Sequence, residues 1–340
     1  MDGLEREPLS SHRPTLSIVV PTLNNEKILP GFLERLSRQT YTGDDVEILI
    51  VDGGSTDRTR EIATRHRTRI IDNPHVLAEP GVDLGIENAR GGLIMVLAVD
   101  NFLDDPAALE RMVTVFEDEA VFAAFPKHAS DGTDTLYTRY INTFTDPFNH
   151  FIYGEAANAR TFGHVYRVVE HNDLFDVYDF SSSPRRPLIA LAQGLTLRSG
   201  FRRRQEDRFD DCLPILDLIT SGRKIAYVHS VSLYHHTVSG WRHFNLKQRW
   251  AVRNALDKKD YGIAYRYRQL SRDQRWRARL WPLYAFSVVL PSGRALFGAV
   301  RDREPIWLFH PVICLQSAGV TACEVIGYYL GKERAVSRQL

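Results

Sequence analysis

Residues 46–57, VEILIVDGGSTD, decide the fold. The run VEILIV is almost wholly apolar and β-branched, which predicts a buried strand. The strand ends at Asp52, and the turn-forming residues after it open a helix over 58–66. A buried strand that leads directly into a helix is typical of a parallel sheet covered by helices.

The same order of strand and helix recurs on both sides of this stretch. Further apolar strands are predicted at 16–20, 69–72 and 93–99. Helices are predicted at about 28–36, 84–90 and 107–119 from their apolar spacing. The predicted fold class is therefore α/β, with a mostly parallel central sheet and helices on both faces.

Polar residues follow three of these strands, at Pro21-Thr22, Asp52-Gly53 and Asp100-Asn101. In open α/β sheets the ligand binds at this carboxyl edge. The sequence has no GxGxxG, which disfavours a dinucleotide enzyme. It also has no GxxxxGK[ST] and no GxSxG, which excludes phosphate-loop NTPases and a serine nucleophile on an elbow turn.

Asp52 and Asp100 each allow two interpretations. Asp52 could face a ligand beside the Gly-Gly turn, or could cap the next helix, a role that Asp57 also fits. Asp100 could bind Mg²⁺ or Mn²⁺, since hard cations prefer carboxylate oxygens. The alternative for Asp100 is a helix cap, for which Asp104 and Asp105 are better placed.

Three segments carry a resemblance to a known family: SIVVPTLNNE (17–26), EILIVDGGSTDRT (47–59) and LGIENARGGLIMVLAVDNFLDDPAAL (84–109). Together they resemble the inverting nucleotide-sugar glycosyltransferases of family two, which have the GT-A type fold. The resemblance covers residues 15–125 closely and 190–255 more loosely.

The resemblance implies a donor site for a nucleoside-diphosphate sugar. The Pro21-Thr22 loop and Glu26 would hold the nucleotide, and Asp52 would contact the base or ribose. The metal-binding DXD triplet aligns with residues 98–100, so Ala98 replaces its first aspartate and Asp100 keeps the last. The implied donor-binding residues are Pro21, Thr22, Leu23, Glu26, Asp52, Gly53, Arg90, Val99, Asp100, Asn101 and Arg198.

The acid–base residue is expected in the second half of the chain. Asp210-Asp211 precedes Gly222, a strand at 224–228 and His235-His236, in the order that the family shows. The resemblance makes Asp211 the general base and His235 a metal ligand, with His236 as its substitute. Without the acidic pair, two adjacent histidines would indicate a surface turn. Glu206-Asp207 is a rival pair with poorer spacing, and residues 202–204 are expected to be a mobile basic supplement to Arg198.

Residues 127–187 match the family poorly and are rich in aromatic residues and histidine. Aromatic faces suit a sugar ring or a lipid carrier, which would make this segment the acceptor site. A small hydrophobic core under a long insertion explains the composition equally well.

The formal net charge of +1 hides a division along the chain. Residues 201–279 carry a net +10 and the others a net −9. Tyr and Trp residues alternate with arginines up to residue 281, and apolar segments follow at 281–300 and 305–330. This pattern is typical of helices that lie on an anionic membrane surface, with buried helices as the alternative. Nucleic acid is not an expected partner.

The predicted organisation has three parts. Residues 1–14 form a flexible N-terminus, 15–255 a GT-A domain and 256–340 a C-terminal helical region with peripheral membrane contact through 262–330. Three cysteines without a CxxC pair favour a reducing compartment, and hence the cytoplasm or the cytoplasmic face of a membrane.

The predicted activity is transfer of a sugar, with inversion, to a hydroxyl acceptor such as a lipid-linked glycan or polyprenyl phosphate. Mg²⁺ or Mn²⁺ is the expected cofactor. Ala98 favours an alternative, a binding module that holds the nucleotide sugar without catalysis. A nucleotidyltransferase is disfavoured because no Gly-rich basic loop follows the first strand.

Overall fold

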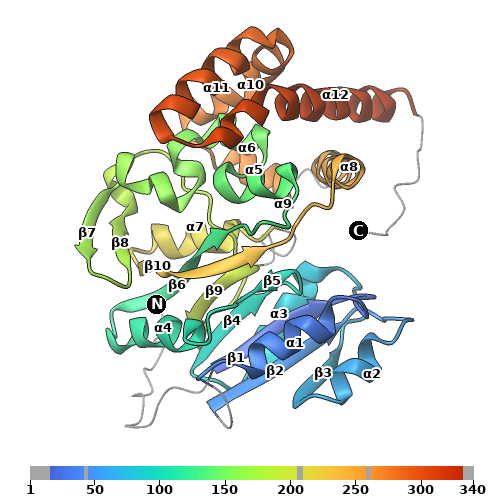
Figure 1. The fold of residues 1–340 in the computed structure, drawn as a ribbon, viewed down its shortest axis with the longest axis vertical. Helices are drawn as coiled ribbons and strands as arrows, with labels where there is room; N and C mark the ends of the chain where they lie inside the picture. The colour runs from blue at the N-terminus through green and yellow to red at the C-terminus, as the bar shows by residue number, and fades with distance from the viewer. Residues whose placement is uncertain (1–15, 42–44, 205–209, 258–261, 332–340) are drawn as a thin grey trace. The chain divides into compact units, whose positions relative to one another are not determined.

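A computed structural model describes residues 16–41, 45–204, 210–257 and 262–331. The predicted flexible N-terminus and the rival pair Glu206-Asp207 lie outside these residues. The chain forms two compact units, coloured by residue number in Figure 1. The sheet unit comprises Met1–His128, Arg167–Ser181 and Ala190–Tyr234, and the helical unit comprises Ala129–Tyr166, Ser182–Ile189 and His235–Leu340.

The sheet unit is built on one ten-stranded sheet, in the order β3-β2-β1-β4-β9-β6-β10-β8-β7, with β5 paired to β10. Its strands are β1 (Leu16–Thr22), β2 (Val46–Asp52), β3 (Thr68–Asp72), β4 (Leu93–Leu97), β5 (Asn101–Phe102), β6 (Val121–Ala129), β7 (Arg167–His171), β8 (Asp176–Asp179), β9 (Gln193–Arg198) and β10 (Lys224–His235). Its helices are α1 (Leu29–Ser37), α2 (Thr59–Thr64), α3 (Ala78–Asn88), α4 (Ala108–Thr114) and α7 (Leu213–Thr220).

The side chains of β1 alternate between two layers of helices. Ile18 and Val20 belong to the main core with residues of α1 and α4, such as Phe32 and Met112. Val19 points the other way and packs so closely on Gly85 of α3 that a Cβ there would lie 2.1 Å from its Cγ1. Helices therefore cover both faces of the sheet, as the wholly apolar strands require.

The structure confirms the predicted α/β class and the four N-terminal strands. Parallel pairing joins β1 to β2, β1 to β4 and β2 to β3, whereas β9 pairs antiparallel with both β4 and β6. Two local expectations were wrong. Pro21 and Thr22 are the last residues of β1 and not loop residues, and α3 begins at Ala78 and not at residue 84.

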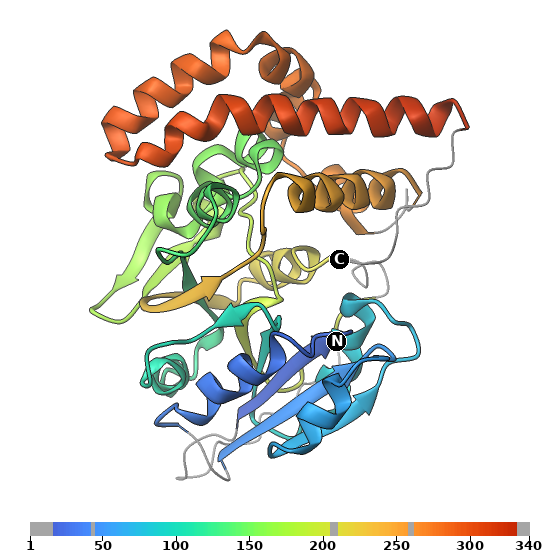
Figure 2. The same cartoon turned by 45° about the vertical axis from the view of Figure 1, so that its right-hand side comes forward.

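The helices predicted for the C-terminal region are present in the helical unit. This unit also contains the helices of the segment around 136–164. Its elements are α5 (Leu136–Phe144), α6 (Pro147–Tyr153), α8 (Trp241–Asp257), α9 (Gly262–Arg268), α10 (Arg272–Ser287), α11 (Val289–Asp302) and α12 (His310–Tyr329). Figure 2 shows α11 and α12 running side by side in this unit.

Aromatic residues of the middle segment form the core of the helical unit. Tyr140 and Phe144 of α5 pack with Trp307, and Phe148 and Phe151 of α6 pack around Trp281. Of the two interpretations of residues 127–187, the structure therefore shows the hydrophobic core for these aromatic side chains.

Candidate functional site

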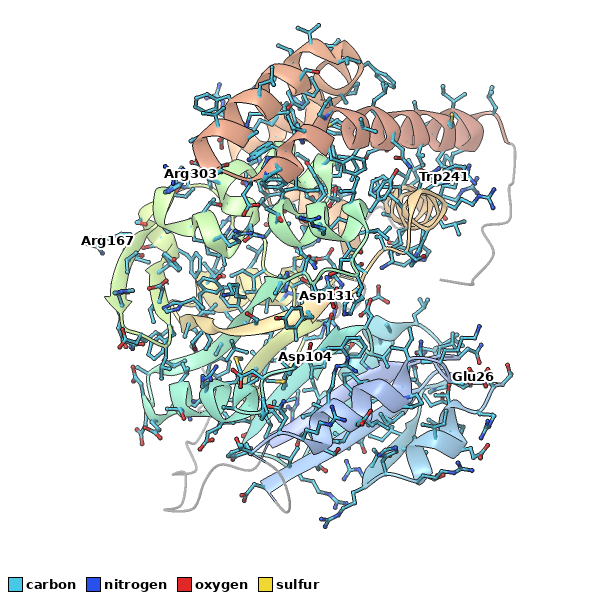
Figure 3. The ribbon with its side chains drawn as sticks, viewed as in Figure 1. Glu26, Asp104, Asp131, Arg167, Trp241 and Arg303 are labelled. Carbon is cyan, nitrogen blue, oxygen red and sulfur yellow. The ribbon has the colours of Figure 1, made fainter. Side chains whose placement is uncertain are left out.

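The register of the sheet aligns three strand ends in the sheet unit. Thr22 pairs with Asp52, and Asp52 pairs with Asp72, so the carboxyl ends of β1, β2 and β3 lie in one row. β4 runs parallel to β1, with Val19 opposite Val96, so the chain after β4 leaves the sheet at the same edge. The predicted ligand edge therefore exists, and Glu26 lies on the loop that follows β1 (Figure 3).

Asp52 makes the turn contacts that its alternative interpretation predicted. Its carboxylate is fully buried and accepts hydrogen bonds from the Ser55 amide, at 3.1 Å, and from the Ser55 hydroxyl, at 2.5 Å. Arg60 donates to the same carboxylate at 2.9 Å and also to Asp72 at 2.7 Å. The Asp52 carboxylate thus fixes the loop shape at this edge, and a nucleotide contact remains a prediction.

The backbone around Gly53 has no room for a side chain. The Gly53 amide donates to the Thr22 carbonyl at 2.8 Å, and a Cβ on Gly53 would lie 2.6 Å from the Val76 carbonyl oxygen. The amide of Glu26 donates to Asp57 and its carboxylate accepts from the Arg58 amide. These bonds join the loops after β1 and β2 at the predicted nucleotide position.

Asp100 and Asn101 follow β4 at the same edge. Asp100 is half-buried, and Val99 is buried in the main core, so Val99 offers a ligand only its backbone. Asn101 donates from Nδ2 to the Ala192 carbonyl at 3.2 Å, while its Oδ1 is buried without a hydrogen-bond partner. Asp100 and Asn101 are consecutive in the chain, and carboxylate and amide oxygens are ligands that hard divalent cations prefer.

A short segment brings Asp211 to this position. The amide of Leu191 donates to the Asp211 carbonyl at 2.9 Å, and the Ala192 carbonyl accepts from the Ala98 amide at 3.2 Å. Two consecutive residues thus contact the Asp211 backbone on one side and the chain around Ala98 and Asn101 on the other. These hydrogen bonds connect the segment that carries the predicted base to the segment that carries the predicted metal ligand Asp100.

The two aspartates of the acidic pair have different roles. Asp210 is buried and accepts hydrogen bonds from the amides of Cys212 and Leu213 at 2.9 and 3.0 Å, where α7 begins. The side chain of Asp211 is 30% exposed. Asp210 therefore holds the turn that leads into α7, and of the two carboxylates that of Asp211 is the more exposed.

Arg203 was expected to be a mobile surface residue, and this was wrong. Its side chain is 1% exposed and lies 3.3 Å from Asp83 of α3 and 3.8 Å from Asp211. It also donates to the carbonyls of Glu79 and Asp210. The sequence gave no periodic signal for this burial, because Arg203 stands in a run of three arginines outside any helix or strand.

Arg198 and Arg90 do not join the carboxyl edge. Arg198 pairs with Leu93 at the amino end of β4, and its guanidinium donates to the carbonyls of Phe116, Asp118 and Val121. Arg90 precedes β4, and its amide donates to Glu47 at the start of β2. The two residues miss the carboxyl edge for different reasons. Arg198 ends β9, which runs antiparallel to β4, and Arg90 lies just before the amino end of β4.

His235 and His236 belong to the helical unit. His235 is buried, and burial followed by the charge of Lys247 lowers its pKa to about 3, so its imidazole is neutral at pH 7. His236 is half-buried and lies 2.7 Å from Asp134 and 3.7 Å from Asp131. Figure 3 labels Asp131 in this group.

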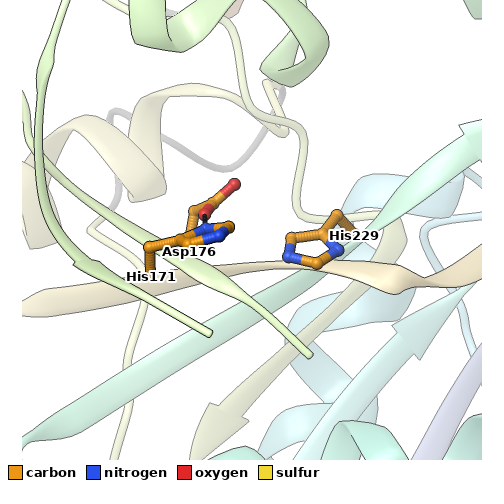
Figure 4. Close-up of side chains that lie close together, drawn as sticks. All are labelled: His171, Asp176 and His229. Carbon is orange, nitrogen blue, oxygen red and sulfur yellow. Dashed lines mark hydrogen bonds and ion pairs between the residues drawn. The ribbon is translucent and has the colours of Figure 1, made fainter. Parts of the chain in front are cut away.

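In the described part of the chain, two groups have ligand atoms close enough together to hold a metal ion, and neither includes Asp100. One is the group of Asp131, Asp134 and His236. The other joins the β7–β8 hairpin to β10: His171 contacts Asp176 at 2.6 Å, and the ring of His229 lies beside that of His171 (Figure 4).

Residues 17–182 match the family model described as Glycosyl transferase family 2. A validoxylamine A glucosyltransferase of Streptomyces hygroscopicus subsp. limoneus is 41% identical over 85 residues, which are 24% of this chain and 18% of that protein. A PGL/p-HBAD biosynthesis glycosyltransferase of Mycobacterium bovis is 34% identical over 105 residues, 29% of this chain and 40% of that protein. The chain thus spans less than half the length of these relatives.

A solved structure supports the fold. The mannosyltransferase PcManGT from Pyrobaculum calidifontis, in complex with GDP-Man and Mn²⁺, superposes with a TM-score of 0.54 at 14% identity. The match covers 92% of this chain and 88% of that one. The sheet and its helices therefore have the predicted GT-A type fold.

The contacts of Arg203 predict a large loss of stability when its charge is removed. We expect Arg203→Met to lower the free energy of unfolding by about 3 kcal/mol, because it leaves Asp83 largely buried without its cation. Arg204→Met is the matched control: its side chain is 61% exposed and pairs with Asp217 at the surface, so we expect a loss below about 1 kcal/mol. Urea unfolding measures both, and equal losses would contradict the role given to Arg203.

Proposed function

We propose that this chain, in which residues 17–182 are a family 2 glycosyltransferase domain, transfers a sugar from a nucleoside-diphosphate sugar to a hydroxyl group with inversion. The relatives named above are glycosyltransferases, and PcManGT binds GDP-Man and Mn²⁺, which supports a nucleotide-sugar donor. The observation that supports the proposal is the pair of contacts through Leu191 and Ala192, which connect the backbone of Asp211 to the chain at Ala98 and Asn101.

The donor would lie along the carboxyl edge of β1, β2 and β4. Pro21, Thr22 and Leu23 end or follow β1, and Gly53 packs its backbone against the Val76 carbonyl, which keeps the two loops close together beside the proposed nucleotide position. Asp52 and Glu26 hold the two loops in shape. The diphosphate would then reach Asp100 and Asn101.

Asp211 would act as the general base. Its partly exposed carboxylate takes the proton of the acceptor hydroxyl while that oxygen attacks the anomeric carbon. The bond from the anomeric carbon to the diphosphate oxygen breaks in the same displacement, which inverts the configuration. Arg203 positions this carboxylate from behind through its contacts with Asp210 and Asp211.

A divalent cation, Mg²⁺ or Mn²⁺, would be held by Asp100 and by the Oδ1 of Asn101 in the sheet unit. The metal-ligand role of His235, which belongs to the helical unit, stays a prediction from the family resemblance. When bound, it would neutralise the negative charge of the leaving diphosphate. The protein residues orient the donor and remove the proton from the acceptor.

We also propose that the helical unit lies on the cytoplasmic face of a membrane, where the acceptor would be a lipid-linked glycan or polyprenyl phosphate. Many large apolar side chains of α10, α11 and α12 are exposed, among them Leu283 (72%), Val289 (76%) and Val300 (81%). Arginines accompany them on α10, which gives the charge complementarity that an anionic lipid surface needs. An exposed thiol at Cys323 fits a reducing compartment.

Contact with the membrane surface fits these helices better than a span. Pro305–Tyr329 is long and apolar enough to cross a membrane, and α10 with α11 passes the same test as a pair bent by 93°. Glu324 of α12, however, is buried against α8, where it lies 2.8 Å from Arg253 and 3.3 Å from Arg249. One face of α12 thus packs on its own unit through a charged group, and only the other face is open.

Asp211→Asn tests the general base. We expect turnover to fall by roughly 10² to 10⁴, because the amide cannot accept the proton, while donor affinity changes less than about twofold. A thermal-shift screen of nucleotide sugars first identifies the donor, and hydrolysis of that donor supplies the rate. Asp217→Asn, on the adjacent helix, is the control. Near-normal turnover in Asp211→Asn would reject its role, and a screen without a stabilising nucleotide sugar would reject the proposed function.

Asp100→Ala tests the metal. We expect Mn²⁺ to raise donor affinity in the unmodified protein and this response to weaken by roughly tenfold in the variant, because the carboxylate ligand is lost. Asp104→Ala is the control, since Asp104 pairs at the surface with Arg35. Donor binding is measured by calorimetry with and without the metal. Donor binding without any donor hydrolysis would instead support the alternative suggested by Ala98, a module that binds without catalysis.

Vesicle binding tests the membrane contact. We expect the protein to sediment with vesicles that contain 20% phosphatidylglycerol at low salt, and the triple variant Leu283→Ser, Val289→Ser, Val300→Ser to bind at least roughly tenfold more weakly. Val168→Ser with Val169→Ser, on exposed positions of β7, is the control. Protein that stays in the supernatant at every lipid concentration would overturn this part of the proposal.

A further inference from the structure

The helical unit contains a cavity of about 400 Å³ that the transfer reaction does not use. Its walls come from α6, α10, α11 and the segment around residue 185, so they belong to one unit. The lining residues are His150, Phe151, Gly154, Glu155, Arg185, Arg277, Tyr284 and Arg294. A smaller cavity of about 220 Å³ shares His150, Gly154, Glu155 and Arg294 with it.

The residues that line this cavity include three arginines and one carboxylate. The carboxylate, Glu155, is bound to Arg301 at 3.3 Å, outside the larger cavity. Burial, followed by the charges of Arg185 and Arg294, lowers the pKa of Arg277, while Asp273 acts in the opposite direction. Burial also lowers the pKa of His150 well below its usual value, so this ring stays neutral. Asp273 pairs with Arg185 and Glu155 pairs with Arg301, so Arg277 and Arg294 leave an excess of positive charge at the cavity.

Each arginine is fixed in place by its own contact. Arg185 donates to Asp273 at 3.1 Å, Arg277 donates to the Phe151 carbonyl at 3.4 Å, and Arg294 lies over the Trp307 ring at 5.3 Å. A guanidinium carries five N–H donors, so these contacts leave donors for a ligand. Three pre-positioned guanidinium groups are the arrangement that binds a tetrahedral oxyanion well, because each can donate two parallel hydrogen bonds.

Apolar side chains stand next to these arginines on the same helices. Leu280 follows Arg277 by three residues on α10, and Phe297 follows Arg294 by three residues on α11, which places each pair on neighbouring positions of one helix surface. Leu280 is 47% exposed and Phe297 is 59% exposed. An oxyanion in the cavity that carried a hydrocarbon chain would thus find apolar surface beside its charged group.

We propose that this cavity is a binding site for a phosphate group, a monoester or diester, held by Arg185, Arg277 and Arg294. The chemistry is shared by free phosphates and by lipid headgroups, and the adjacent apolar side chains favour the lipid. The test has two arms. One uses lipid vesicles and rests on the membrane contact proposed above, and the other uses a soluble phosphate and tests the cavity alone.

In the soluble arm, the full chain is titrated with glycerol 3-phosphate by calorimetry. We expect saturable binding that weakens about tenfold in Arg277→Gln and less in Arg277→Lys, which keeps the charge but not the fork of donors. Arg303→Gln is the matched control: this arginine, labelled in Figure 3, is exposed at the end of α11 and does not line the cavity, so binding should not change. Arg185→Gln, on a segment outside the helices, replaces Arg277→Gln if circular dichroism shows that the latter is misfolded.

The lipid arm compares two kinds of phosphatidylcholine vesicle with equal negative charge. One kind contains 20% phosphatidic acid, and the other contains a synthetic lipid sulfonate in its place. We expect tighter binding to phosphatidic acid, and loss of this preference in Arg277→Gln but not in Arg303→Gln. Binding in the soluble arm without that preference identifies a free phosphate as the ligand. Absence of saturable phosphate binding, or equal losses in Arg277→Gln and Arg303→Gln, would overturn the proposal even if the protein binds membranes.

Discussion

The parallel register of β1 with β2 and β4 is the constraint on which the site depends. It aligns Thr22 with Asp52, and it brings the chain after β4 to the same edge. Buried apolar side chains hold this register, because a shift by one residue would turn Ile18 and Val20 away from their core and Val19 away from Gly85. The position of the polar residues at the edge is thus set by the core beneath them.

A second constraint joins the two halves of the site. Leu191 and Ala192 lie where β9 is about to begin, and their backbone groups bond to Asp211 on one side and to Ala98 on the other. Main-chain hydrogen bonds of this kind do not depend on side-chain identity. The local geometry that keeps Asp100 and Asn101 in place is therefore compatible with alanine at position 98.

Much of this could be predicted from the sequence, and the successes share a cause. The strands are short and wholly apolar, and the resemblance of 17–26, 47–59 and 84–109 to a known family supplied the edge residues. Predictions failed where contacts between residues far apart in the sequence determine the position of a side chain. The burial of Arg203 depends on Asp83 of α3, 120 residues earlier in the chain, and the position of Arg198 depends on the direction in which β9 runs. Neither contact leaves a local periodic pattern.

The helical unit shows how one sequence feature can serve two purposes. Its aromatic residues were open to two interpretations, and Phe144, Phe151 and Trp307 now form the interior of the unit. Since Phe151 and Trp307 also hold Arg277 and Arg294 in position, the same packing that buries the aromatic rings fixes the charged groups around the cavity. Charge and apolar surface therefore meet on α10 and α11 because of how the core is built. A ligand with a phosphate and a hydrocarbon chain matches both features of these helices, whereas a purely polar ligand would leave the exposed apolar positions of α10 and α11 without a partner.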